Sequence, residues 1–99
     1  MRVMFERTGG FAGMRLTTTA DTNQLTTADA QRLRQLVTSC SFFTLPETIA
    51  PQQAGPDRFQ YKITVEDQGR VHTVTASDTE LPPNVRPLAD FLSQQARRG

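Results

Sequence analysis

The chain has 99 residues with eleven basic and ten acidic side chains, a formal net charge of +1 and a hydrophobic content of 36%. This length predicts one domain with one modest core, and the balanced charge excludes the basic footprint of a nucleic-acid or anionic-membrane binder. One cysteine and one histidine are too few for an internal disulfide or a structural zinc site. Apolar runs of at most three residues predict no transmembrane helix and no signal peptide, so we expect a small, soluble, cytoplasmic protein.

The beginning of the chain predicts a β-hairpin. Residues 2–8 and 14–20 both alternate between two faces, with Val3 and Phe5 on one face of the first strand. The connecting residues 9–13 read Gly-Gly-Phe-Ala-Gly, and glycine accepts a positive φ at little steric cost. Two strands joined by a short glycine-rich connection are most simply an antiparallel hairpin.

A helix follows, beginning at Thr26 or Thr27. Thr26 with Asp29 three residues later resembles a capping box. An apolar stripe recurs at helical spacing through Ala30, Leu33, Leu36, Val37 and Cys40. We expect the apolar segment 42–46 to close the edge of the core, and residues 46–57, with three prolines, to form an exposed loop.

The second half of the chain predicts another hairpin and another helix. Residues 58–66 alternate perfectly between apolar and polar side chains, and residues 70–77 return as the fourth strand after an Asp-Gln-Gly turn. The positive φ of that turn is expected at Gly69. The last helix runs from about Pro83 to Arg97, with Pro87 in its first turn.

The order strand-strand-helix-strand-strand-helix predicts a single α+β domain over residues 1–99. A four-stranded antiparallel sheet with both helices packed on one face buries every apolar stripe in one core. The other face of the sheet is then exposed to solvent. The pattern leaves open the order in which the two hairpins meet.

Few side chains are equipped for catalysis. His72 lies in mid-strand, in phase with Val74 and Ala76, which favours a packed or edge histidine over a catalytic one. Cys40 lies on a helical apolar stripe, which favours a small buried hydrophobe over a reactive thiol. Carboxylates stand near strand ends at Asp57, Glu66, Asp67 and Asp78. Such positions are more typical of turns than of a metal site, so we expect no enzyme activity, no metal and no cofactor.

The glycine-rich connection is the most informative segment. A phosphate-cradling loop would need a helix N-terminus behind it, whereas a strand follows here. Phe11, flanked by glycines, is either an exposed anchor for a partner pocket or folds back to cap the core. The scarcity of catalytic groups indicates a binding module that presents loops on a small sheet.

Four blocks of the sequence resemble the emfourin family of bacterial inhibitors of protealysin, a thermolysin-family zinc metallopeptidase. They are Phe-Glu-Arg-Thr-Gly-Gly-Phe-Ala-Gly-Met-Arg-Leu at 5–16, Phe-Phe-Thr-Leu-Pro at 42–46, the long block 57–74, and Pro-Leu at 87–88. The resemblance implies a proteinaceous inhibitor of a thermolysin-like metallopeptidase as the function, and that peptidase as the partner. We expect it to be a monomer when free.

An inhibitor of a cleft enzyme must insert a projection. The candidate partner-binding residues are Gly9, Gly10, Phe11, Ala12 and Gly13 in the first connection and Asp67, Gln68 and Gly69 in the last hairpin turn; the proline-rich loop 46–56 is a third possibility. Phe11 is favoured because a thermolysin-like cleft accepts bulky apolar side chains. The alternatives are a non-inhibitory interaction module and a small enzyme that uses His72.

Overall fold

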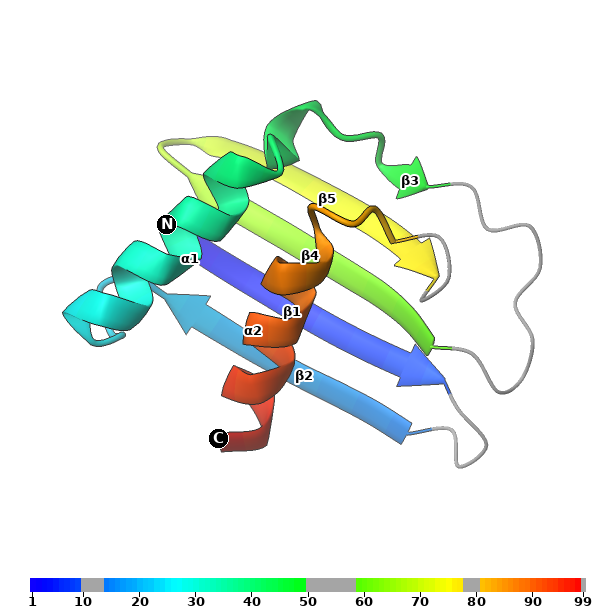
Figure 1. Cartoon of the computed structure of the whole chain (residues 1–99), viewed down its shortest axis with the longest axis horizontal. Coiled ribbons are helices and arrows are strands. Elements are labelled where there is room, and N and C mark those ends of the chain that lie inside the picture. Colours follow the sequence, from blue (N-terminus) through cyan, green and yellow to red (C-terminus); the bar gives the residue numbers. More distant parts are fainter. Residues whose placement is uncertain (10–13, 50–58, 78–80, 99) are drawn as a thin grey trace.

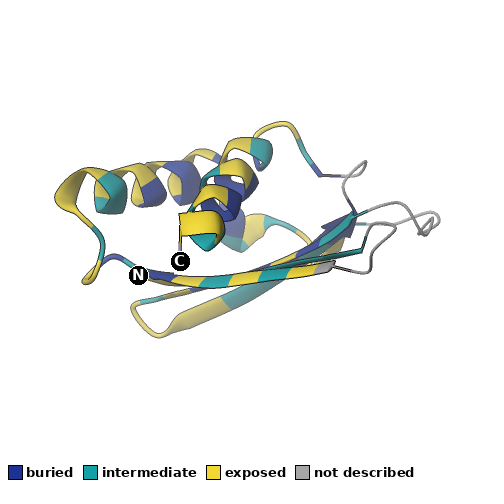
Figure 2. Cartoon of the chain, turned by 90° about the horizontal axis from the view of Figure 1, so that it is seen from below, coloured by how far each residue is buried: buried dark blue, intermediate teal, exposed yellow. Residues whose placement is uncertain are grey.

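The computed structural model describes residues 1–9, 14–49, 59–77 and 81–98 (Figure 1). Within these residues five strands form one sheet in the order β2-β1-β4-β5-β3, and two longer helices lie across one of its faces. In chain order the elements are β1 (Arg2–Gly9), β2 (Met14–Asp21), α1 (Thr27–Ser39), the 3-10 helix η1 (Phe42–Thr44), β3 (Thr48–Ile49), β4 (Phe59–Asp67), β5 (Arg70–Ser77) and α2 (Arg86–Arg98). The predicted α+β class and the packing of both helices on one face are confirmed (Figure 2).

The predicted four-stranded, fully antiparallel sheet is wrong, because the described residues form a fifth strand. β3 pairs in parallel with β5, placing Thr48 opposite Thr75 and Ile49 opposite Ala76. The N–H of Thr75 also donates to the carbonyl of Glu47 at 2.7 Å. This strand lies inside the segment predicted as an exposed loop, and two residues are too few to show an alternating pattern. Residues 50–57 of that segment lie outside the described residues.

The two hairpins meet through β1 and β4, which settles the order that the sequence leaves open. β1 pairs antiparallel with both β2 and β4, so it lies inside the sheet. Val3 faces Val65 and Phe5 faces Ile63 across the β1–β4 pair. The apolar faces of the two hairpins therefore join into one continuous surface.

The core lies between this surface and the helices (Figure 2). Among its most enclosed members are Val3, Leu33, Ile63, Val65, Val85, Leu88 and Leu92. Each such side chain stabilises the fold by about 1.5–3 kcal/mol through burial. The opposite face of the sheet holds a broad depression of about 610 Å³, lined in part by Glu6, Thr17, Thr19, Lys62 and Thr64. In the described ranges, no helix is long and apolar enough to cross a membrane.

Both helices begin close to where the sequence predicts. The hydroxyl of Thr26 accepts a hydrogen bond from the N–H of Asp29 at 3.1 Å, so Thr26 is the N-cap of α1. α2 begins at Arg86 rather than Pro83, since a hydrogen-bonded turn precedes it. Pro87 lies in the first turn of α2, as predicted.

The turn between β4 and β5 has two central residues, both in the left-handed region. Gln68 has a φ of 52° and Gly69 a φ of 80°, while Asp67 pairs with Arg70. Two central residues with positive φ define a type I′ turn, whose twist matches that of the flanking strands. The positive φ predicted at Gly69 is confirmed.

Replacing Gly69 by alanine should lower the free energy of unfolding by about 1–2 kcal/mol, the cost of holding an L-residue in the left-handed region. A Cβ at this position would meet no atom within 4 Å, so the loss reports backbone conformation alone. Gln68→Asn is the matched control and should raise stability, because Asn-Gly is the preferred pair for this turn. Urea denaturation measures both, and an unchanged midpoint for Gly69→Ala would contradict the assignment.

Candidate functional site

The two segments singled out from the sequence lie at opposite ends of the sheet. Gly9 pairs with Met14 and Phe59 at one end, which we call the glycine end. The Asp67–Arg70 turn closes the other end, which we call the turn end. The eight residues of β1 separate the two ends by roughly 25 Å. The structure thus offers two separate surfaces.

The glycine end is the place where the predicted binding segment 9–13 begins and ends. Of this segment, the structure describes only Gly9. Gly9 ends β1 with a φ of 115°, a conformation that favours glycine. Gly10, Phe11, Ala12 and Gly13 lie outside the described residues, so both alternatives for Phe11 stay predictions. β3 and β5 also end here, because Ile49 faces Ala76 and Ser77 faces Gln60, next to the start of β4.

A pocket of about 310 Å³ opens beside the glycine end on the helix side of the sheet. Its lining residues are Arg7, Arg15, Leu16, Phe59 and Arg97, and we call it the arginine pocket. Arg7 follows Val3 and Phe5 in the alternation of β1, so it occupies the core-facing side where the core ends. α2 contributes Arg97 from its last turn. This pocket was not predicted from the sequence, although Arg7, a charged residue in phase with Val3 and Phe5, is a signal for it.

The arginines of this pocket differ in their partners. The guanidinium carbon of Arg7 lies 4.6 Å from the centroid of the Phe59 ring, which is a cation–π contact. Arg15 forms an ion pair with Glu6, with 2.6 Å between nitrogen and oxygen. Among the described residues, neither Arg7 nor Arg97 has a carboxylate within ion-pair distance. The pocket therefore carries excess positive charge.

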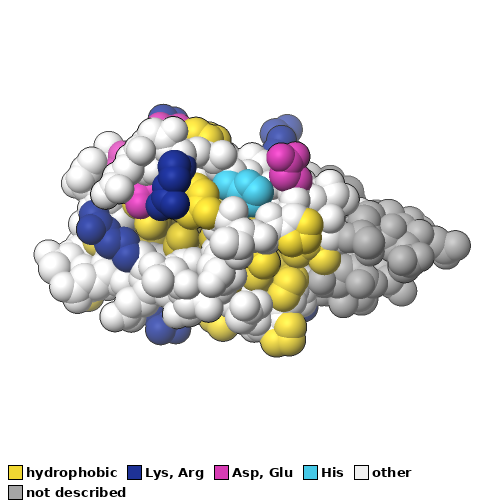
Figure 3. Space-filling view, turned by 90° about the horizontal axis from the view of Figure 1, so that it is seen from above, with side chains coloured by type: hydrophobic (Ala, Val, Ile, Leu, Met, Phe, Trp, Pro, Cys, Tyr) yellow, Lys and Arg dark blue, Asp and Glu magenta, His cyan; other side chains and the backbone are white. Residues whose placement is uncertain are grey.

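At the turn end, aromatic side chains pack along the edge of β5. The guanidinium carbon of Arg70 lies 4.2 Å from the centroid of the Phe43 ring. Nε2 of His72 donates a hydrogen bond to the carbonyl of Leu45 at 2.7 Å, and the ring of Phe42 meets the imidazole edge-on. Figure 3 looks onto this edge and shows the histidine beside apolar, basic and acidic side chains. His72 is thus a packed histidine that attaches the segment after η1 to the sheet.

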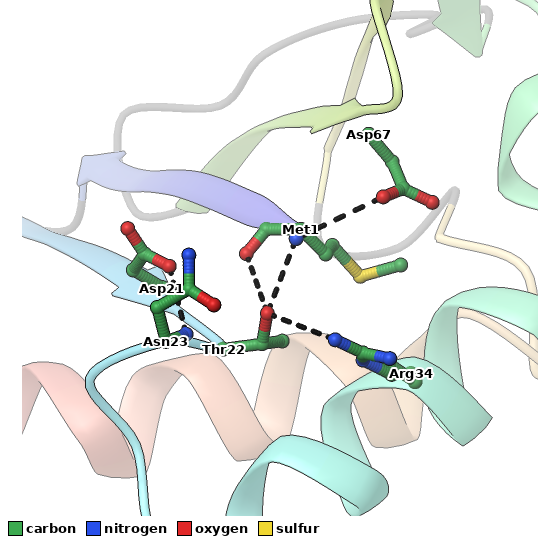
Figure 4. Close-up of polar contacts among 6 residues, drawn as sticks. All are labelled: Met1, Asp21, Thr22, Asn23, Arg34 and Asp67. Atoms are coloured by element: carbon green, nitrogen blue, oxygen red, sulfur yellow. Dashed lines mark hydrogen bonds and ion pairs between the residues drawn. The ribbon is translucent and has the colours of Figure 1, made fainter.

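Polar contacts tie the first residue of the chain into the turn end (Figure 4). The α-amino group of Met1 lies 3.7 Å from a carboxylate oxygen of Asp67 and donates to the hydroxyl of Thr22 at 3.1 Å. Arg34 of α1 donates to the same hydroxyl at 3.3 Å. Asp67, predicted as a binding residue, therefore has a structural contact that links the turn to β1.

Cys40 is 1% exposed, and its thiol donates to the carbonyl of Val37 at 3.4 Å. Burial raises the pKa of the Cys40 thiol above its ordinary value, which disfavours the reactive thiolate. The expectation of a small buried hydrophobe is confirmed. Within the described part of the chain, no three histidine, cysteine or acidic side chains are grouped as metal ligands.

Comparison with known proteins gives one match. A family model described as Emfourin matches residues 5–93. The chain belongs to the emfourin family. No curated protein and no solved structure matches it. The emfourin match includes most of β1 and all of the β4–β5 hairpin, so it spans both ends of the sheet. Membership of an inhibitor family indicates inhibition of a metallopeptidase and favours a non-enzymatic role.

In the folded protein, Cys40 should react with a thiol reagent at pH 8 far more slowly than in the urea-unfolded chain.

The raised pKa of Cys40 also means that unfolding releases a proton once the pH exceeds the ordinary thiol value of 9.0. The contribution of Cys40 to the free energy of unfolding is therefore fully present below pH 9.0 and falls as the pH rises above it. Cys40→Ala is the control, because its stability should fall less steeply with pH; equal pH profiles would contradict the assignment.

Proposed function

We propose that the chain inhibits a thermolysin-like zinc metallopeptidase by occluding its active-site cleft, and that the segment 9–13 enters the cleft. The emfourin match over residues 5–93 carries the proposal. Steric closure of a cleft requires shape and a well-held projection, and the inhibitor need supply no zinc ligand. A chain with a packed histidine and a buried thiol suits that role.

The geometry of the two ends favours the glycine end as the primary contact. At the turn end, two residues connect β4 to β5, and Asp67 is held by Met1. So tight a turn has little reach into a cleft. The connections at the glycine end are longer than this two-residue turn. Four residues lie between the paired positions Gly9 and Met14, and nine lie between Ile49 and Phe59. The turn residues 67–69 are the second candidate surface.

The base of the proposed projection is firmly held. β1 pairs along its whole length with β2 on one side and β4 on the other. The Arg7–Phe59 contact adds a side-chain link between β1 and β4 next to Gly9. A projection that leaves a rigid base loses less conformational entropy on binding than one on a loose base.

A non-inhibitory interaction module is the second candidate. It would use the same surfaces and bind a partner without blocking its activity. The pairing of loops with a rigid sheet serves either role.

Titration of a thermolysin-family peptidase with the purified chain separates the two functions. The panel should include the peptidase encoded nearest to the gene. We expect activity to fall to a residual level as the chain approaches the peptidase concentration. A stable complex with undiminished activity would favour the interaction module, and no loss of activity across the panel would reject the inhibitor.

Phe11→Ala tests the projection. If Phe11 is the anchor, the substitution should weaken inhibition by about 2 kcal/mol or more and leave the melting temperature unchanged. If Phe11 caps the core instead, stability should fall by roughly 3–5 kcal/mol. Val71→Ala is the matched control near the turn end, because Val71 is 60% exposed. Weaker inhibition by Val71→Ala, with Phe11→Ala unaffected, would transfer the contact to the turn end.

A further inference from the structure

We propose that the arginine pocket binds an acidic side chain of the peptidase. A neighbouring apolar side chain of the peptidase packs against the pocket floor, which is formed by Leu16 and Phe59. The inference rests on the proposed function and names a second contact beside the projection. It assigns to Arg7 and Arg97 the recognition of the carboxylate, and to Leu16 and Phe59 the apolar contact.

The placement of Arg7 prepares it for a carboxylate. Its guanidinium lies over the Phe59 ring, 4.6 Å from the centroid. This contact holds the guanidinium against the ring, and among the described residues its N–H donors have no carboxylate partner. The N–H donors of a guanidinium match the two oxygens of a carboxylate, and a guanidinium that is already held in place loses little freedom when it binds one.

The positive charge of the pocket also favours the binding of an anion. Three arginines line it, and among the described residues Glu6 provides a carboxylate for Arg15 alone. The whole chain has a net charge of only +1, so this concentration of positive charge is local. Arg98, next along α2, lies 3.9 Å from Asp29 on α1, whereas Arg97 has no such partner in the described ranges. A carboxylate between Arg7 and Arg97 would offset their repulsion.

The size and the floor of the pocket favour a protein side chain. A volume of about 310 Å³ suits one or two side chains, and Leu16 and Phe59 are partly buried there beside the core. Free phosphate would use the arginines and leave this apolar floor without a partner. The pocket adjoins Gly9, so the surface within its reach is the rim of the cleft that the projection enters.

The double variant Arg7→Gln/Arg97→Gln tests the proposal through inhibition. We expect the inhibition constant to rise by about tenfold or more and to become less sensitive to ionic strength, because two cationic contacts are lost. Arg32→Gln, an exposed position on α1 outside the pocket, is the control and should leave inhibition unchanged. Arg97→Gln alone alters only the last turn of α2, so it tests the pocket even if the double variant melts early. Unchanged inhibition by both pocket variants would overturn the proposal.

A binding experiment tests the pocket independently of inhibition. The probes are the peptide acetyl-Leu-Glu-Phe-amide, its Gln counterpart and inorganic phosphate, each titrated into the labelled wild-type chain and followed by NMR. We expect saturating shifts at Arg7, Leu16, Phe59 and Arg97 with the Glu peptide and much weaker ones with the Gln peptide. Equal shifts with both peptides, or stronger shifts with phosphate, would overturn the assignment.

The two experiments keep the proposals apart. A wild-type chain that inhibits no peptidase rejects the proposed function, and the peptide titration then decides the pocket by itself. A wild-type chain that inhibits, with pocket variants that inhibit equally well, rejects the pocket and leaves the proposed function standing.

Discussion

The antiparallel pairing of β1 with β4 is the constraint on which the rest of the structure depends. It joins two hairpins from opposite halves of the chain and aligns Val3 with Val65 and Phe5 with Ile63. A slip of one residue would turn the apolar side chains of β1 toward water, because successive side chains in a strand point to opposite faces. The burial of these residues under the helices therefore holds the register, and the register determines which residues share each end of the sheet.

This register also places at opposite ends of the sheet two surfaces that differ in how their charged groups are paired. At the turn end, Asp67, Met1 and Thr22 connect to one another and to α1, so polar groups are used internally. At the glycine end, Arg7 and Arg97 face a pocket without a described carboxylate. A surface whose charges are already paired offers little to a partner, whereas unpaired charges beside an apolar floor offer both affinity and orientation. The physical contrast between the two ends supports the proposed contact at the glycine end.

Most of the fold could be predicted from local patterns, and the exceptions have physical reasons. Four strands, both helices, the Thr26 cap and the positive φ of Gly69 follow from alternation, helical spacing and turn chemistry. β3 could not be found in this way, because its two residues acquire strand geometry only from pairing with Thr75 and Ala76. The junction of the hairpins was likewise undetermined, since either order would bury the same apolar faces.

The candidate site was predicted less completely than the fold. Residues 9–13 and 67–69 were both predicted to bind a partner, but the sequence does not show how far apart they lie. Only the register of the sheet shows that they are at opposite ends. The arginine pocket combines residues from three strands and the last turn of α2, so no single segment displays it. Arg7 was the one local signal, as a charge in an apolar phase.

The position of β1 between β2 and β4 has a consequence for how the protein is made. β1 is synthesised well before one of its two partner strands, because β4 begins only at Phe59. The first hairpin and α1 must therefore remain without half of their core until the second hairpin is synthesised. Pairing between such distant segments requires closing a long loop, which slows folding relative to helical proteins of similar size. The glycine end, which needs β1, β2, β4 and the last turn of α2, is thus completed only after Arg97 has been synthesised.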